Sequence, residues 1–243
     1  MGPTVHDVRG APIPGLAAVP REPRLAATAF RDVLANAAGR GEVRAAGRPT
    51  RVLLRGPKVA ERVGTPESAR QSLAASIRRA AAGAGVAPDL SVAVARAESN
   101  LDPGARSNDG LSVGTFQMTK ATKAEMRRKI AAGHASRPAG TDDVALGVGY
   151  LRYLHDLFAR NAKLAPGLRT IPVAPAGERR LFAIAAFNAG EGRVAGAQAK
   201  AAKSGGDPTR FADVRPFLPR ITRAYVDRVV AYAAEEEPRG TVV

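Results

Sequence analysis

From residue 65 onward, apolar side chains recur every three or four residues, and no stretch alternates apolar with polar residues over any length. This period is typical of helices with one buried face, because successive residues of a strand would point to opposite faces. Glycine, proline, asparagine and aspartate interrupt the pattern and delimit the segments. The sequence therefore predicts a mainly α domain over residues 65–235, with helices at 66–83, 88–98, 120–132, 143–158, 179–187, 193–203 and 219–234. Residues 161–177 are predicted to form a long loop.

The first 64 residues do not follow this pattern. They are rich in Pro, Gly, Ala and Arg and contain few large apolar side chains, so little burial is available to offset the entropy of ordering them. We therefore predict a weakly ordered N-terminal extension over residues 1–64, with a short amphipathic helix at 26–38 and a short strand at 51–55. A polar tail is predicted at residues 236–243.

The residue content excludes several classes of site. The chain has no cysteine, which excludes disulfides, thiolate metal sites and cysteine nucleophiles. Its histidines, His6, His134 and His155, form no pair at metal-ligand spacing, so neither a metal nor another cofactor is expected. No apolar run approaches the roughly 20 residues that span a bilayer. Residues 1–30 also lack the continuous apolar segment of a secretory signal.

The formal net charge of +15 predicts attraction to polyanions. Nucleic acid is one such partner, but the basic clusters between residues 44 and 62 contain no aromatic side chain, and the chain has no zinc-finger spacing. A solvated basic surface, or attraction to an anionic cell envelope, accounts for the charge equally well. We expect a monomer without a specific nucleic-acid partner.

One acid is distinguished by its position in the chain. The apolar run 90–95 leads directly to Glu98, and a loop dense in Gly, Asn, Asp, Ser and Pro follows it. Burial disfavours the charged form of a carboxyl group, and the negative end of a helix dipole acts in the same direction, so we expect the pKa of Glu98 to be raised. A carboxylic acid that keeps its proton near neutral pH is suited to general acid catalysis of glycoside cleavage. The other carboxylates of the loop, Asp102 and Asp109, fit turn and cap positions.

Four blocks of short motifs follow one another along the helical region. The first two are Glu98-Ser99 with Pro103 and Ser107, and then Gly114-Thr115-Phe116-Gln117-Met118-Thr119. The third is Ala186-Phe187-Asn188-Ala189-Gly190, and the last is Leu218-Pro219 with Thr222, Tyr225 and Val226. Together with the helix around Gly149-Tyr150-Leu151, these blocks resemble the soluble lytic transglycosylase family over about residues 70–232. The resemblance implies a helical fold similar to goose-type lysozyme.

The resemblance also implies an activity, that of a peptidoglycan lytic transglycosylase. Such an enzyme cleaves the β-1,4 bond between N-acetylmuramic acid and N-acetylglucosamine and forms 1,6-anhydromuropeptides. Glu98 would protonate the leaving oxygen and then accept a proton from the 6-hydroxyl of the muramic acid. The acetamido group of the substrate would stabilise the cationic centre, so no second carboxylate is needed. Two alternatives remain, a hydrolytic muramidase similar to goose-type lysozyme and a non-catalytic peptidoglycan-binding envelope module.

By the same resemblance, a set of residues is expected to line the sugar-binding groove: Ser99, Ser107, Gly114, Phe116, Gln117, Met118, Phe187, Asn188, Ala189 and Tyr225. Tyr225 is expected to face Glu98, whereas the aromatic residues of helix 143–158 are expected to pack in the core. The chain departs from the family at Phe187, where Tyr is common, and at Ile221, where Glu is usual. The loop 110–114 is also one residue longer than in many relatives.

A peptidoglycan substrate places the expected site of action in the cell envelope, in the periplasm or the cell wall, or outside the cell. Because no signal peptide is recognised, we expect export by another route. The N-terminal extension is then the predicted contact with a secretion or flagellar apparatus.

Overall fold

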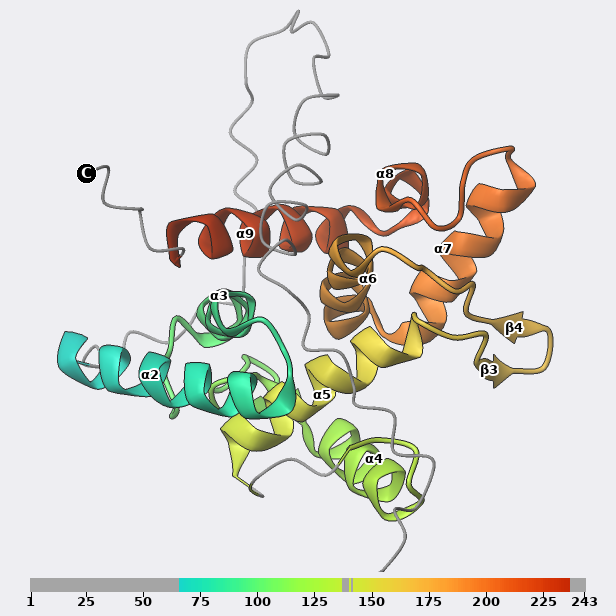
Figure 1. Cartoon of the computed structure of the whole chain (residues 1–243). Helices are drawn as coiled ribbons and strands as arrows, with labels where there is room; N and C mark the ends of the chain where they lie inside the picture. Colours follow the sequence, from blue (N-terminus) through green and yellow to red (C-terminus); the bar gives the residue numbers. More distant parts are fainter. Residues whose placement is uncertain (1–65, 137–139, 141, 237–243) are drawn as a thin grey trace, which may run out of the picture.

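The computed structural model describes residues 66–136, 140 and 142–236. The predicted helix at 26–38 and the predicted strand at 51–55 lie outside these residues. The described part is built mainly of helices (Figure 1), which confirms the predicted mainly α class.

Eight α-helices and one 3-10 helix are found in the described residues. In chain order they are α2 (Glu67–Ala84), α3 (Pro88–Ser99), α4 (Lys120–Ala131), α5 (Asp143–Leu157), α6 (Ala176–Ala189), α7 (Glu191–Lys203), α8 (Phe211–Val214), η1 (Arg215–Phe217) and α9 (Arg220–Glu236). Seven of them correspond to the predicted segments. The short α8 and η1 were not predicted, because neither is long enough to show a helical period.

Two small antiparallel hairpins lie among the helices and were not predicted. The strand β1 (Ser112–Val113) pairs with β2 (Met118–Thr119), and β3 (Lys163–Ala165) pairs with β4 (Leu168–Arg169). The second hairpin lies within residues 161–177, which were predicted to be a long loop. Its turn contains Gly167 at a φ of 71°, a conformation that hairpin turns often need and glycine adopts without strain. Strands of two or three residues are too short to show alternation.

The helix α3 runs through the middle of the domain. Its residues from Leu90 to Ala95 are all buried, and small side chains such as Ser91 and Ala93 let neighbouring helices approach closely. Figure 1 shows α3 between α2 and α9, and α6 between α5 and α9. This burial fixes the last turn of α3, which carries Glu98.

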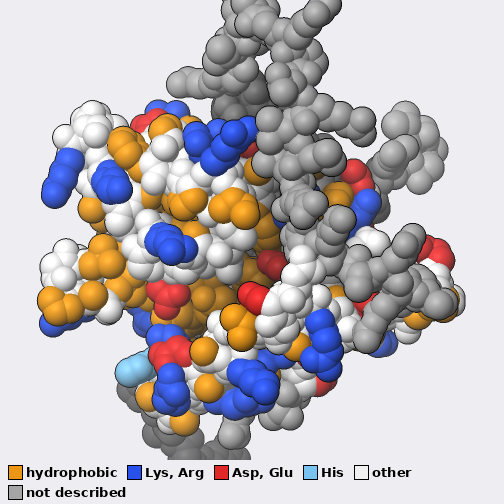
Figure 2. Space-filling model, turned by 180° about the vertical axis from the view of Figure 1, so that it is seen from behind, with side chains coloured by type: hydrophobic (Ala, Val, Ile, Leu, Met, Phe, Trp, Pro, Cys, Tyr) orange, Lys and Arg blue, Asp and Glu red, His pale blue; other side chains and the backbone are white. Residues whose placement is uncertain are grey.

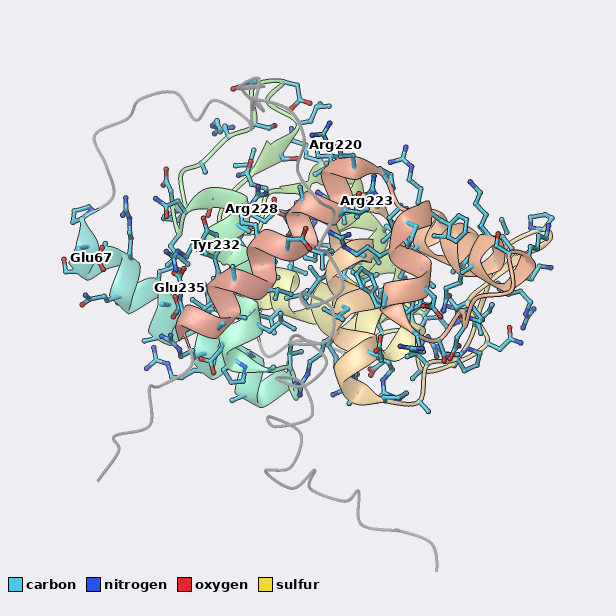
Figure 3. The ribbon with its side chains drawn as sticks, turned by 90° about the horizontal axis from the view of Figure 1, so that it is seen from above. Glu67, Arg220, Arg223, Arg228, Tyr232 and Glu235 are labelled. Atoms are coloured by element: carbon cyan, nitrogen blue, oxygen red, sulfur yellow. The ribbon has the colours of Figure 1, made fainter. Side chains whose placement is uncertain are left out.

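The last turn of α9 is tied to α2 and α3 by ion pairs. Arg78 Nη2 lies 2.5 Å from Glu236 Oε2, and Arg96 Nη1 lies 2.6 Å from Glu235 Oε2. The Arg96 guanidinium also stands over the ring of Tyr232, 4.1 Å from its centroid. Figure 3 follows the labelled side chains of α9 from Arg220 at its start to Glu235 near its end. The sequence pattern assigns Glu236 to the polar tail, but the helix α9 includes it. The ion pairs of Glu235 and Glu236 with the two arginines stabilise this last turn.

Candidate active site

Glu98 occupies the last turn of α3, at the base of an open cavity of about 400 Å³. Directly after the helix, Asn100 and Leu101 adopt left-handed backbone conformations with φ of 54° and 59°. These two residues turn the chain sharply away from the helix axis, so the following loop runs along the cavity instead of covering Glu98. The side chain of Glu98 is partly buried.

The protonation state of Glu98 is set by opposing effects. Burial raises the pKa of its carboxyl group from 4.5 to about 7, against the lowering effects of a hydrogen bond from Tyr225 and the positive charge of Arg228. The Tyr225 hydroxyl donates this hydrogen bond to Glu98 Oε1 at 2.6 Å. Burial also raises the pKa of Tyr225 well above 10, so its hydroxyl keeps its proton as a donor. Glu98 is therefore poised to give and take a proton near neutral pH.

Tyr225 faces Glu98 as predicted, although it belongs to the buried face of α9. The predicted turn roles of the loop carboxylates are also confirmed. Asp102 Oδ1 accepts a hydrogen bond from the Gly104 backbone N–H at 2.8 Å, and Asp109 Oδ1 accepts one from the Leu111 N–H at 3.0 Å.

Three predicted groove residues instead lie beneath the groove, and their roles are corrected. Ser99 is buried, and its Oγ donates to the Thr115 carbonyl oxygen at 2.8 Å. Phe116 is fully buried, with its ring packed against the α-carbon of Gly147. Gly114 has a φ of 92° and lies under the carboxylate of Asp143, which leaves no space for a side chain. These three residues hold the loop in place. They can influence ligand binding only by positioning the residues that line the cavity.

Six predicted groove residues line the cavity with Glu98: Ser107, Gln117, Met118, Phe187, Asn188 and Ala189. Tyr225, also predicted for the groove, is buried and lies outside this lining, so it reaches the site only through its hydrogen bond to Glu98. Several of the lining residues also brace the walls. Ser107 Oγ donates to Asp109 Oδ1 at 2.5 Å, and the amide nitrogen of Gln117 donates to the carbonyl oxygens of Ala105 and Gly114 at 3.0 and 2.8 Å. Their contacts with sugars stay a prediction.

Asn188 links two elements at the cavity edge. Its Oδ1 accepts a hydrogen bond from the Thr222 hydroxyl of α9 at 2.9 Å. This bond fixes the orientation of the side-chain amide. Because Asn188 is exposed, its amide N–H groups remain accessible to a ligand in the cavity.

Tyr150 of α5 was expected to pack in the core, but it is a wall of the cavity. Its ring lies 5.3 Å from that of Phe187, and the Phe187 ring lies 6.3 Å from that of Phe116. The Phe187 ring thus packs against two aromatic neighbours. This aromatic wall has the flat apolar faces on which sugar rings stack.

Glu191 is a carboxylate near the cavity that the sequence analysis missed. The Tyr150 hydroxyl donates to Glu191 Oε2 at 3.5 Å, and burial together with this carboxylate raises the pKa of Tyr150. The sequence pattern places Glu191 in the segment that ends the predicted helix 179–187, before the next predicted helix begins at residue 193. The structure shows that Gly190, at a φ of 84°, separates two helices and that Glu191 begins α7. An acidic residue directly after a helix-terminating glycine favours the start of a new helix, because a negative charge is stabilising at a helix N-terminus. This signal could have placed Glu191 at the start of α7.

Within the described ranges, no three His, Asp or Glu side chains are grouped closely enough to hold a metal ion. Over the same residues, no helix combines the length and apolarity that crossing a membrane requires.

Residues 75–209, more than half of the chain, match the protein family described as "Transglycosylase SLT domain". The chain belongs to this family. The predicted lysozyme-like helical class is confirmed by this membership together with the helical structure.

Two curated relatives carry the name membrane-bound lytic murein transglycosylase F. The one from Desulfosudis oleivorans is 32% identical over 147 residues, which cover 60% of this chain and 28% of the relative. The one from Alcanivorax borkumensis is 30% identical over 141 residues, which cover 58% of this chain and 26% of the relative. The chain thus matches little more than a quarter of the length of these relatives.

Two solved structures are also similar. The 70 kDa soluble lytic transglycosylase of Escherichia coli aligns with a TM-score of 0.48 and 26% identity, over 68% of this chain and 24% of that one. An inactive mutant of the lytic transglycosylase Slt from Pseudomonas aeruginosa aligns with a TM-score of 0.47 and 26% identity, over 67% of this chain and 23% of that one.

Proposed function

We propose that this chain is a peptidoglycan lytic transglycosylase, which cleaves the β-1,4 bond between N-acetylmuramic acid and N-acetylglucosamine and leaves a 1,6-anhydro end. The observation that carries the proposal is the state of Glu98, whose pKa is raised to about 7 at the base of a cavity in a chain of the SLT family. The relatives named lytic murein transglycosylase support the same activity.

In the first step, protonated Glu98 gives its proton to the glycosidic oxygen as the bond to the anomeric carbon breaks. Tyr225 donates a hydrogen bond to Oε1 of Glu98, so it orients the carboxyl group and favours the carboxylate that the step produces. The acetamido group of the muramic acid stabilises the positive charge at the anomeric carbon. A second carboxylate is not required for this role.

In the second step, the Glu98 carboxylate accepts the proton of the muramic 6-hydroxyl, and that oxygen attacks the anomeric carbon. The new bond closes the 1,6-anhydro ring, and Glu98 returns to its protonated form. An intramolecular hydroxyl held near the reacting carbon has an effective molarity of about 10⁵ M or more, so it competes well with water even in an open cavity.

Digestion of purified sacculi with mass analysis of the products tests this proposal. We expect muropeptides with 1,6-anhydro ends, which are lighter by one water than the products of hydrolysis. Products with reducing ends alone would make the chain a hydrolytic muramidase, with Glu98 still the acid. Release at the same low level by the parent and by Glu98→Gln would instead indicate a non-catalytic binding module. Glu125→Gln on α4, where the parent side chain is 45% exposed, is the matched control.

A peptidoglycan substrate places the proposed site of action in the cell envelope. We expect residues 1–64, which lie outside the described part, to serve delivery through a secretion or flagellar apparatus and not catalysis. A chain that starts at residue 65 should therefore release muropeptides from isolated sacculi at a rate close to that of the full chain. A large loss in this assay, with the helical circular dichroism intact, would show that the extension contributes to the site.

A further inference from the structure

A second cavity, of about 450 Å³, lies between α4, the end of α5, the hairpin β3–β4 and the start of α7. We call it the hairpin cavity. Its apolar lining includes Leu157, Leu164 and Leu168, and its basic lining consists of Lys129, His134, Arg160 and Lys163. Figure 2 shows the face opposite to that of Figure 1, where basic side chains lie among hydrophobic and acidic ones over the lower part of the molecule.

The hairpin cavity and the active-site cavity share a wall. Tyr150 lines the active-site cavity and donates a hydrogen bond to Glu191, which lines the hairpin cavity. The ring of Tyr150 also stacks on that of Tyr153, with centroids 6.2 Å apart, and Tyr153 lines the hairpin cavity. A branched ligand bound at Glu98 can therefore place one branch over this wall and into the second cavity.

The charges of the hairpin cavity are unbalanced. His134, Arg160 and Lys163 are exposed, and within the described part of the chain none of them forms an ion pair with a carboxylate. Lys129 is paired with Glu125 at 3.2 Å and stands over the ring of Tyr153. Glu191 is the one acid among the lining residues, and it accepts the hydrogen bond from Tyr150. The cavity thus offers several cations around an apolar lining, which suits a ligand that carries carboxylates and small apolar groups.

We propose that the hairpin cavity binds the carboxylates of the peptide branch of peptidoglycan, an inference that rests on the proposed function. The N-acetylated sugars of a peptide-bearing glycan strand are uncharged, because the lactyl carboxyl of the muramic acid forms the amide bond to the peptide. The short peptides attached to the muramic acid carry the negative charge in their carboxylates. These peptides also contain alanine, whose side chain is small and apolar. The cavity is therefore a specificity site that favours peptide-bearing strands over bare glycan.

The test compares two substrates that differ only in the peptide. One is isolated glycan strands with their peptides, and the other is the same strands after an amidase has removed the peptides, which leaves a lactyl carboxylate on each muramic acid. We expect the double variant Arg160→Gln/Lys163→Gln to lose about three- to thirtyfold in kcat/KM on peptide-bearing strands, the effect of two solvent-screened charge contacts, and to cleave bare strands like the parent. Added salt should reduce the preference of the parent in the same way.

A control variant separates the cavity from overall charge. Arg79→Gln/Lys203→Gln removes the same charge from exposed positions on α2 and at the far end of α7, and should keep the preference for peptide-bearing strands. Equal losses for both double variants, or equal losses on both substrates, would overturn the inference while leaving the proposed function standing. No cleavage of either substrate by the parent would overturn both.

A binding measurement adds a readout that does not depend on turnover. Titration of the full chain with the free tripeptide L-alanyl-γ-D-glutamyl-L-lysine should shift the amide NMR signals of residues 160–169, and Arg160→Gln/Lys163→Gln should weaken these shifts. Shifts confined to the residues around Glu98, with none in the hairpin, would contradict the assignment of the peptide to this cavity.

Discussion

Replacing Glu98 with glutamine is expected to stabilise the fold above neutral pH. The pKa of this carboxyl group is 4.5 in an unfolded chain and about 7 in the folded one, because burial favours the neutral acid. At about 1.36 kcal/mol for each pH unit, this difference costs the folded parent about 3 kcal/mol once Glu98 is ionised. Below pH 4.5 the group is neutral in both states, and the cost is absent. It grows between pH 4.5 and 7 and is constant above that range. Glutamine is never ionised, so the variant avoids this cost.

Urea unfolding of the parent and of Glu98→Gln between pH 4 and 9 measures this difference. We expect nearly equal free energies of unfolding at the acid end and an advantage for the variant of up to about 3 kcal/mol at pH 8 and above. The control Glu125→Gln should gain nothing above pH 7, because hydrogen bonds from Arg128 and Lys129 lower the pKa of Glu125. A variant that is equally or less stable than the parent at pH 8 would refute the reasoning, because ionised Glu98 would then carry no cost.

Three further outcomes are expected. Glu98→Gln should release muropeptides from sacculi about 10²- to 10⁴-fold more slowly than the parent, as measured by mass analysis of the products. Tyr225→Phe removes a hydrogen bond that lowers the pKa of Glu98, so the alkaline limb of the pH profile of kcat/KM should move to higher pH; movement to lower pH would contradict this. In Gly147→Ala the new methyl group would overlap the ring of Phe116, which should cost about 1–3 kcal/mol of stability in urea unfolding. The matched Gly196→Ala meets nothing within 4 Å and should be neutral or stabilising by up to about 1 kcal/mol.

The long helices could be predicted from the sequence because their burial pattern repeats within each segment. The position of Glu98 at the end of a buried helix follows in the same way, since the apolar run and the turn-rich loop are adjacent in the chain. Its raised pKa was also expected, because burial next to a helix end is a local property.

Contacts between distant segments could not be derived from periodicity. Tyr225 lies 127 residues after Glu98, and only the family resemblance indicated that the two side chains meet. Tyr150 was expected in the core because the apolar stripe of α5 is wide, yet one edge of that stripe forms the groove wall. The hairpin β3–β4 left no signal, because its strands are two and three residues long.

The ion pairs between α9 and the first two described helices also determine where the chain enters and leaves the domain. Arg78 and Arg96 hold the carboxylates of Glu235 and Glu236, so both ends of the described region lie on the same side of the molecule (Figure 1). A domain whose two ends lie on the same side can be joined there into a longer polypeptide without its core being stretched. This arrangement suits a domain that occurs within proteins of different length. In the two curated relatives, the part that matches this chain is about a quarter of the full length.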